Sequence, residues 1–410
     1  MELYEANKYS MQNSITEVGP YLYPLGFPIL ITPIYAVWGL DFILLKVICC
    51  LFFLGSLPLI FRFMKPRLDN YYYALVLTAL LAFNGYFTNF GNNILSDFPF
   101  FYFLFLSFYL FDKKESFWKQ LLLGACIFYT YLIRDVGLFL IPTYLAFQFS
   151  QRKTSNTKWS VKLLPVALFL VLFSISKALI PPGGENHVHM ILSEFSWALL
   201  IDNIHYYLLL FSKFFFFGQE YLSIGILVSV LVLMGVLSSF SKTWPFALFL
   251  TTNLFMLIIW PSQQGMRFIF PILPFLTLYL IKSFKIIADQ VLLSAKNRYR
   301  ILMAFCLLFV FKTVLDTFKY PTAPNQVYTD EMQEIYNYVV NNIPETETIG
   351  ATKPRVLALF SNAKSVVMDL EHFNNAPIKY LLVTKVDAAN YHWQQFGVKK
   401  EFANFLILEK

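Results

Sequence analysis

A single carboxylate stands at the first turn of a long apolar run. Asp97 begins the stretch DFPFFYFLFLSFYLF, a run of aromatic and aliphatic residues that is long enough to enter a bilayer. Burying a carboxylate beside hydrocarbon is costly, so a charge in this place indicates a functional site. Asp97 can act as a general base, orient an acceptor group or bind a divalent cation. The alternative is a helix cap, in which Ser96 and Asp97 satisfy the free N–H groups of the helix start.

Two arginines also stand at the ends of apolar runs. Arg267 precedes a run that contains Pro271 and Pro274, and Arg134 is adjacent to Asp135 between two other runs. A guanidinium is always charged, and its fork of donors matches phosphate oxygens, so Arg267 can clamp a lipid-linked phosphate. The alternative for Arg267 is an interfacial side chain that snorkels to lipid headgroups. The alternative for the Arg134–Asp135 pair is a polar turn between helices.

Other polar side chains carry weaker signals. Lys353 and Arg355, near the C-terminal end, can contact a phosphate or a sugar, or can form part of a solvated face. His187 and His189 form a His-x-His pair, which binds zinc only if further ligands join it. Since no partner motif accompanies this pair, we predict no metal site. The sequence identifies no cofactor, and a divalent cation stays open as an option.

The composition is that of a membrane protein with many spanning segments. The 410 residues are 57% hydrophobic and 14% charged, with a mean hydropathy of +0.56, whereas soluble domains carry nearer a quarter charged residues. The net charge of +7 is typical of Lys-rich and Arg-rich cytoplasmic loops and does not indicate nucleic-acid binding. The four cysteines lie within apolar runs, without metal-finger spacing, and we interpret them as small core residues: Cys49, Cys50, Cys126 and Cys306.

These candidate residues must be positioned by helices. Apolar runs predict about ten spans, at 41–62, 70–89, 96–111, 117–133, 136–150, 161–180, 220–240, 244–260, 268–285 and 300–318. The stretch Tyr21–Gly39 is apolar but broken by three prolines, so we expect an interfacial or re-entrant segment there. Phe195–Gly218 is long enough to span, but its Asp202, His205 and Lys213 favour a helix lying at the outer interface.

Basic loops predict the orientation of these spans. Four clusters of Lys and Arg are expected on the cytoplasmic side: Arg62, Lys65 and Arg67; Lys113, Lys114 and Lys119; Arg152, Lys153, Lys158 and Lys162; and Lys282, Lys285, Lys296, Arg298 and Arg300. If the segment near 195–218 crossed the membrane, the last of these clusters would fall on the outer side. If it lies at the interface, all four clusters fall on the cytoplasmic side. Both termini then lie outside, and the loops that hold Asp97, Arg134 and Arg267 share the outer side.

The composition changes near residue 320. The stretch TDEMQEIYNYVVNNIP predicts an amphipathic helix, and short β-type runs follow at Thr348–Ala351, Ser365–Met368, Tyr380–Thr384 and Asn404–Leu408. We therefore expect a mostly α protein in three parts: an outer N-terminal segment with the interfacial stretch (1–40), a transmembrane helical domain (41–319) and a small α/β extracytoplasmic domain (320–410).

Five segments together resemble the C-type glycosyltransferases, the polytopic enzymes that use polyprenyl-phosphate sugars, such as protein O-mannosyltransferases and the lipid A aminoarabinose transferase. The proline-rich stretch after their first outer loop resembles YLYPLGFPILITPIYAVWG, and their S-[DE]-x-P helix start resembles NNILSDFPFFYFLFLSFYL. Their R-x-x-G-L-x-L-I hairpin resembles YLIRDVGLFLIPTYLAF, their R-[YF]-x-x-P-x-x-P-F pattern resembles GMRFIFPILPFLTLYL, and their K-P-R-x-L element resembles ATKPRVLALFS. The five occur in the family's order, over about residues 21–370.

The resemblance implies an enzyme that moves a sugar from a polyprenyl-phosphate donor to a lipid, glycan or protein acceptor on the outer face of the cell (inner) membrane. Asp97 matches the family's second acidic position, a base or acceptor-orienting residue, and Arg267 matches its lipid-phosphate contact. The family carries an earlier helix followed by a first acidic motif. This chain begins beyond that helix, and Glu2 and Glu5 are the acidic residues near the expected place, neither in a D-x-x-x-Y context.

Two other functions remain open. A transporter or flippase of a lipid-linked intermediate would fit a polytopic chain, although transporters often show repeat symmetry and midplane charges. Here we find no internal repeat, and the site-like charges gather at the outer ends of helices, which favours chemistry on an outer-leaflet lipid. A catalytically degenerate family member with a role in assembly is the third possibility.

Overall fold

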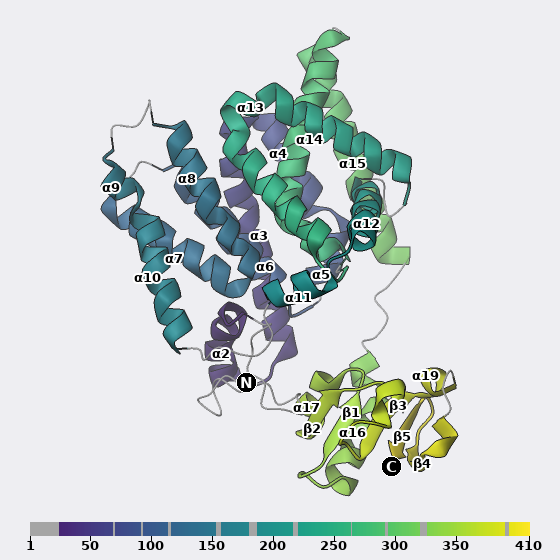
Figure 1. The fold of residues 1–410 in the computed structure, drawn as a ribbon. Coiled ribbons are helices and arrows are strands. Elements are labelled where there is room, and N and C mark those ends of the chain that lie inside the picture. The colour runs from purple at the N-terminus through teal and green to yellow at the C-terminus, as the bar shows by residue number, and fades with distance from the viewer. Residues whose placement is uncertain are drawn as a thin grey trace. The chain divides into compact units, whose positions relative to one another are not determined.

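The computed structural model describes residues 24–68, 70–91, 93–113, 116–152, 157–179, 187–215, 220–263, 265–291, 294–319, 326–389 and 393–410. These residues form two compact units, a helical unit that ends at Lys319 and a C-terminal α/β unit (Figure 1). The helical unit contains the main hydrophobic core, and the C-terminal unit has two smaller ones.

The helices of the helical unit differ widely in length, from 4 residues in α9 to 38 in α13. Its α-helices are α2 (Gly26–Trp38), α3 (Phe42–Met64), α4 (Tyr71–Ala82), α5 (Gly85–Gly91), α6 (Asp97–Phe111), α7 (Phe117–Ile133), α8 (Leu140–Ser150), α9 (Trp159–Lys162), α10 (Leu164–Leu179), α11 (His187–Glu194), α12 (Trp197–Phe215), α13 (Leu222–Ile259), α14 (Leu273–Gln290) and α15 (Ala295–Lys319). Short 3₁₀ turns join several of them: η1 (Lys65–Arg67), η2 (Asp135–Phe139), η3 (Gly265–Phe268) and η4 (Phe270–Ile272).

Fewer helices than predicted are long enough to cross a bilayer. Among the described residues, three stretches have the length and hydropathy of a span, Phe42–Arg67, Leu222–Ile259 and Phe270–Gln290. A fourth is possible if α4 and α5, which meet at 49°, form one bent span. A span needs about 20 residues, whereas α6 has 15 and α8 has 11. The predicted count of about ten is therefore not confirmed.

One difference arises in α13. The predicted spans 220–240 and 244–260 both fall within this single helix of 38 residues. Pro245 lies inside it and has no N–H to donate to the preceding turn. The helix nevertheless continues, and in Figure 1 its ribbon changes direction part-way along. Its middle packs against α14, where the hydroxyl of Tyr279 donates to the carbonyl of Thr243.

The N-terminal proline-rich stretch is helical in part. The helix α2 runs from Gly26 to Trp38 and includes Pro33. With 13 residues it is roughly 20 Å long at 1.5 Å per residue, which is too short to span a hydrocarbon core about 30 Å thick. The prediction that Tyr21–Gly39 does not form a clean span agrees with this length.

Aromatic packing holds α6 in the centre of the helical core. Its buried residues include six phenylalanines, at positions 98, 100, 101, 105, 108 and 111. Phe108 contacts the ring of Phe63 from α3 and those of Phe246 and Phe249 from α13, with centroids 5.1 to 6.1 Å apart. Aromatic pairs at such distances add to the free energy of burial, so the C-terminal part of α6 is held by α3 and α13.

The C-terminal unit is a three-layer α/β structure. Its strands are β1 (Thr348–Ala351), β2 (Lys364–Val367), β3 (Tyr380–Thr384), β4 (Gly397–Glu401) and β5 (Phe405–Glu409), in the order β2-β1-β3-β5-β4. β1 is parallel to β2 and β3, while β5 is antiparallel to β3 and β4. The helices are α16 (Asp330–Asn342), α17 (Pro354–Ser361), α18 (Leu370–Phe373) and α19 (Lys385–Ala389).

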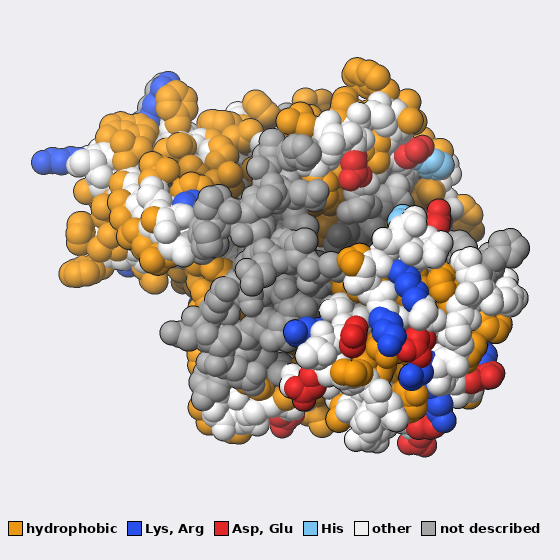
Figure 2. Space-filling view, turned by 60° about the horizontal axis from the view of Figure 1, so that its bottom comes forward, with side chains coloured by type: hydrophobic (Ala, Val, Ile, Leu, Met, Phe, Trp, Pro, Cys, Tyr) orange, Lys and Arg blue, Asp and Glu red, His pale blue; other side chains and the backbone are white. Residues whose placement is uncertain are grey.

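Alternation along the strands gives the sheet two buried faces. Tyr380 and Leu382 of β3 pack in the cluster that contains α16, while Leu381 and Val383 pack with α18, as expected when successive strand residues point to opposite faces. Figure 2 shows hydrophobic side chains over much of the helical unit, and Lys, Arg, Asp and Glu side chains gathered on the C-terminal unit. A water-facing C-terminal unit and a lipid-facing helical unit are consistent with this distribution.

Candidate functional site: a buried carboxylate between two arginines

Asp97, the first residue of α6, lies between two guanidinium groups. Its Oδ1 is 3.0 Å from Nη2 of Arg134. Arg267 binds the same carboxylate through two hydrogen bonds, from Nη2 to Oδ2 at 2.9 Å and from Nε to Oδ1 at 3.3 Å. The three residues come from separate parts of the chain. The structure therefore brings together three of the predicted site residues.

Arg134 is placed by a tight turn at the end of α7. The helix ends at Ile133, and Arg134 has an extended backbone (φ −153°, ψ 133°) that starts the turn η2. The turn packs against α7 at Gly137, where a Cβ would lie 2.7 Å from the carbonyl carbon of Thr130. A side chain there would push η2 away from α7, so this glycine keeps the turn close to α7.

Arg134 also lies near aromatic rings. Its Cζ is 5.9 Å from the ring centroid of Phe100 and 5.5 Å from that of Phe268. Guanidinium groups are attracted to the faces of aromatic rings within about 6 Å. Phe100 belongs to α6 and Phe268 follows Arg267, so the aromatic contacts join the same three segments as the ion pairs.

Arg267 is placed by a second turn, which precedes α14. Gly265 has φ +67°, a backbone conformation that glycine adopts readily and other residues rarely do. The 3₁₀ turn η3 (Gly265–Phe268) starts at this residue and carries Arg267. The prolines of the predicted motif, Pro271 and Pro274, lie in the next turn and in the first turn of α14, where a missing N–H is tolerated.

The site combines strong burial with an excess of positive charge. The side chains of Asp97, Arg134 and Arg267 are 3%, 14% and 27% exposed. Among these three groups in contact, two positive charges meet one negative charge. A buried charge needs a partner, because desolvation is costly, and the pairs meet this need for Asp97. The remaining positive charge suits an anion, and Arg267 is the more accessible of the two arginines.

The alternatives for Asp97 and Arg267 can now be compared with the geometry. Both oxygens of Asp97 face guanidinium groups, so the carboxylate does more than begin a helix. Arg267 extends to a buried acid and is not simply a side chain that snorkels to headgroups. Two cations beside the carboxylate disfavour a divalent cation, because like charges repel. In the part of the chain that the structure describes, no group of three or more His, Cys, Asp and Glu side chains is placed to hold a metal.

The other predicted residues lie elsewhere or outside the described parts. Asp135 follows Arg134 as the first residue of η2 and is half-buried. Lys353 is exposed at the start of α17, in the C-terminal unit. The side chain of Arg355 lies outside the described residues, as do Glu2 and Glu5 and the side chains of His187 and His189. The predicted roles of these residues stay predictions.

Sequence reasoning missed a second ion pair, at the other end of α6. Asp112 directly follows the last residue of this helix and forms two hydrogen bonds of 2.7 Å with Nη1 and Nη2 of Arg67. We had interpreted Arg67 only as one of the basic residues that set the orientation. The rings of Phe63 and Phe246 lie 3.6 and 4.4 Å from Cζ of Arg67. Phe63 is one turn before Arg67, but Phe246 and Asp112 come from distant segments, so no local signal indicated this pair.

Comparison with protein families gives one match over nearly the whole chain. Residues 16–396 match the family described as "Predicted membrane protein (DUF2079)". The chain belongs to this family. No curated protein matches the sequence at a significant level.

Solved structures show which fold this DUF2079 protein has. It is similar to ArnT from Cupriavidus metallidurans bound to undecaprenyl phosphate, with a TM-score of 0.62 and 10% identity, over 99% of this chain and 91% of that one. The apo state of the same protein gives a TM-score of 0.58. The Archaeoglobus fulgidus oligosaccharyltransferase, in complex with zinc and sulfate, gives 0.60 at 11% identity, over 92% of this chain and 60% of that one.

These likenesses confirm the fold that the motifs suggested. The protein has the C-type glycosyltransferase fold, mostly helical, with a small C-terminal sheet. Identities near 10% carry information on the fold alone, so the substrates must be argued from this chain's own residues.

Proposed function

We propose that this protein is a membrane glycosyltransferase that takes a sugar from a polyprenyl-phosphate donor. The observation that carries the proposal is the meeting of Arg134 and Arg267 on the buried Asp97. A transferase of this kind needs a cationic group for the donor phosphate and a carboxylate for the acceptor. The cluster provides both in one place, within a fold shared with a protein whose structure contains undecaprenyl phosphate.

The arginines bind the donor in this proposal. A sugar phosphodiester carries one negative charge, which matches the single excess positive charge of the three groups in contact. Charge-assisted hydrogen bonds from a guanidinium to phosphate are among the stronger polar contacts in proteins. Arg267 is the more exposed of the two arginines and turns to the phosphate, while Arg134 stays on Asp97.

Asp97 then acts on the acceptor. When Arg267 moves to the donor phosphate, Oδ2 of Asp97 becomes available to accept a proton. The acceptor oxygen attacks the anomeric carbon, the bond from that carbon to the phosphate oxygen breaks, and polyprenyl phosphate leaves as the anion. The acceptor proton passes to Asp97, which acts as a general base. The bond that forms and the bond that breaks lie on opposite sides of that carbon, which makes the transfer inverting.

The orientation deduced from the basic loops puts this chemistry on the outer face of the cell membrane, with a lipid, glycan or protein as acceptor. Lys353 and Arg355 contact the substrate in this proposal, as does Asp135. A flippase and an assembly protein remain the competing functions. They differ from a transferase in a measurable way, since neither breaks the bond between the sugar and the phosphate.

A transfer assay tests the proposal. Inverted and right-side-out vesicles receive undecaprenyl-phosphate mannose or undecaprenyl-phosphate glucose with labelled sugar, and release of undecaprenyl phosphate is followed. We expect release from wild type and less than one hundredth of it from Asp97→Asn. An Arg152→Gln variant, which changes an exposed arginine after α8, should match wild type. Equal release from Asp97→Asn and wild type would exclude Asp97 as the base.

A further inference from the structure

A second polar site lies at the opposite end of α6 from Asp97. Arg67 pairs with Asp112 immediately after this helix ends, while Asp97 begins it. The 15 residues of α6 rise roughly 22 Å at 1.5 Å each. The proposed transferase site therefore does not include this region, and any ligand here has a separate function.

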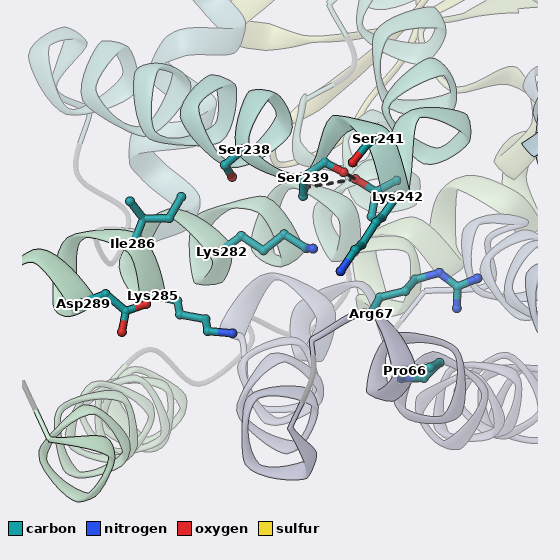
Figure 3. A pocket seen from close by; sticks show the side chains of 11 residues that line it. Pro66, Arg67, Ser238, Ser239, Ser241, Lys242, Lys282, Lys285, Ile286 and Asp289 are labelled. Carbon is teal, nitrogen blue, oxygen red and sulfur yellow. Dashed lines mark hydrogen bonds between the residues drawn. The ribbon is translucent and has the colours of Figure 1, made fainter.

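A cavity of about 330 Å³ is found at this end. Its cationic residues come from three elements: Arg67 from η1, Lys242 from the middle of α13, and Lys282 and Lys285 from α14. Figure 3 shows the side chains of Lys242 and Lys282 extending into the space beside Arg67. We call these four residues and the space between them the basic cavity.

Hydroxyl groups and one acid complete its lining. Ser239 and Thr243 of α13 line the cavity and share a hydrogen bond of 3.1 Å. The only acidic residue among its described lining residues is Asp289, which pairs with Arg298. When Asp112, the partner of Arg67, is counted with Asp289, the four cations outnumber the two carboxylates by two, and Arg298 adds a further positive charge. Ammonium, guanidinium and hydroxyl groups can each donate a hydrogen bond to a phosphate oxygen.

The side chain of Arg67 is firmly held at the edge of the basic cavity. Its side chain is 9% exposed and lies between the rings of Phe63 and Phe246. Its two Nη atoms are used by Asp112 and by the carbonyl of Phe63, but its Nε is buried without a hydrogen-bond partner among the described residues. Arg67 therefore forms a fixed part of the lining, and its charge adds to that of the lysines.

General topology rules explain only part of this arrangement. The excess of Lys and Arg in cytoplasmic loops accounts for the presence of basic residues at this end. It does not account for a concave site formed by three elements around an arginine that is nine-tenths buried. Basic pockets between membrane helices on the cytoplasmic side bind anionic lipid headgroups, and this end is cytoplasmic in the orientation deduced from the loops.

We propose that the basic cavity binds a phosphate group. Two sources carry this chemistry, the headgroup of an anionic phospholipid and free phosphate. The ammonium groups of Lys242 and Lys282 donate hydrogen bonds to the phosphate oxygens, and Asp112 keeps the guanidinium of Arg67 in position beside them. Binding joins η1, α13 and α14, which otherwise meet as like-charged neighbours, and so stabilises the helical unit.

Nanodiscs of two compositions test this proposal. The full-length protein is placed in phosphatidylcholine alone or with 20% phosphatidylglycerol, and native mass spectrometry counts the phosphatidylglycerol retained. The test variants are Lys242→Gln and the double variant Lys242→Gln/Lys282→Gln. The matched control is Lys177→Gln, which removes an exposed lysine from α10. At roughly 1 kcal/mol for each lysine near anionic lipid, we expect a loss of affinity of about five-fold for the single variant and about 25-fold for the double variant.

A second arm separates the two sources. Inorganic phosphate is titrated calorimetrically into the phosphatidylcholine nanodiscs. If phosphate binds wild type and displaces phosphatidylglycerol, the free ion is a ligand; if only phosphatidylglycerol is retained, the headgroup is the ligand. Either result supports the proposal provided that the double variant loses binding. Equal retention of phosphatidylglycerol by the double variant, Lys177→Gln and wild type, without phosphate binding, would overturn it.

Discussion

The two ends of α6 carry the same chemical pair in different surroundings. At its start Asp97 is 3% exposed and faces two arginines, whereas beyond its end Asp112 is 27% exposed and faces one. Asp97 has two arginine partners, so one of them can leave the carboxylate to bind a substrate while the other stays paired with it. The Asp112 end uses its carboxylate to hold an arginine in place. One carboxylate is thus the centre of a site, and the other supports a neighbouring one.

The aromatic neighbours differ in the same way. Cζ of Arg67 lies 3.6 and 4.4 Å from the rings of Phe63 and Phe246. Cζ of Arg134 lies 5.9 and 5.5 Å from those of Phe100 and Phe268. Close ring contact limits the rotamers of a side chain, so Arg67 is held more firmly than Arg134. We infer that the Asp97 end is the one in which arginines change partners during function.

Removing each carboxylate should give the largest difference between the two ends. Asp97→Asn leaves Arg134 buried with a weaker partner, and breaking a buried pair costs about 3–5 kcal/mol. Asp112 is more exposed than Asp97, so water can replace part of what its carboxylate provides, and for Asp112→Asn we expect a smaller loss, of about 1 kcal/mol. Unfolding in mixed micelles by increasing SDS measures both free energies. Equal losses would remove the distinction between the two ends.

Gly137 tests whether the turn η2 places Arg134. In Gly137→Ala the new Cβ would meet the backbone of Thr130 at 2.7 Å, and overpacking of this kind costs about 1–3 kcal/mol. Gly55→Ala is the control, because its Cβ would meet only the ring of Tyr102, at 3.1 Å. We expect Gly137→Ala to lower both stability and donor binding. If Gly137→Ala behaved as Gly55→Ala does, the turn would not determine the position of Arg134.

The smallest effect concerns an exposed pair in the C-terminal unit, which contrasts with the buried pair at Asp97. Nδ1 of His372 lies 2.7 Å from Oδ1 of Asp369, which raises the pKa of His372 above its ordinary value. The stabilisation is therefore complete below the ordinary histidine pKa and is lost as the pH rises through the raised one. The pKa of Asp369 is lowered, first by the N–H of His372, so its contribution is present above the ordinary Asp pKa and is lost as the pH falls through the lowered one.

An NMR titration of the histidine ring checks this assignment. In Asp369→Asn the pKa of His372 should return toward its ordinary value, while the thermal stability at neutral pH should change very little, because both groups are largely exposed. An unchanged pKa of His372 in this variant would show that the pair does not form in solution.

Sequence reasoning found the participants of the site but not their contacts. Charge parity predicted that Asp97, Arg134 and Arg267 share one side of the membrane, because each lies in or beside a loop that the basic clusters place on the outer side. The contacts depend on the paths of the turns η2 and η3, through Gly137 and the positive φ of Gly265. Such paths follow from tertiary packing, and no local pattern predicts them. The pairing of Arg67 with Asp112 was missed for the same reason.

For secondary structure as well, some elements were predicted from the sequence and others were not. The β-branched and aromatic runs at Thr348–Ala351 and Tyr380–Thr384 form β1 and β3 as predicted. The strand β4 was missed, because GVKKE is charged and pairs only along one edge of the sheet. In the helical unit, the apolar run 117–133 forms α7 with the predicted bounds. The run predicted at 136–150 is shorter as an α-helix, because its first residues form the turn η2 and α8 begins only at Leu140, and hydropathy does not distinguish such a turn from a helix.

Binding of undecaprenyl phosphate tests the central claim most directly, because it does not depend on knowing the sugar. Native mass spectrometry in nanodiscs compares wild type, Arg267→Gln and the exposed control Arg152→Gln. A lost hydrogen bond to a charged group is worth about 1.5–3 kcal/mol, so Arg267→Gln should bind at least ten-fold more weakly while Arg152→Gln binds as wild type does. Equal binding by all three would show that the cluster at Asp97 does not hold the lipid phosphate, and would contradict the account.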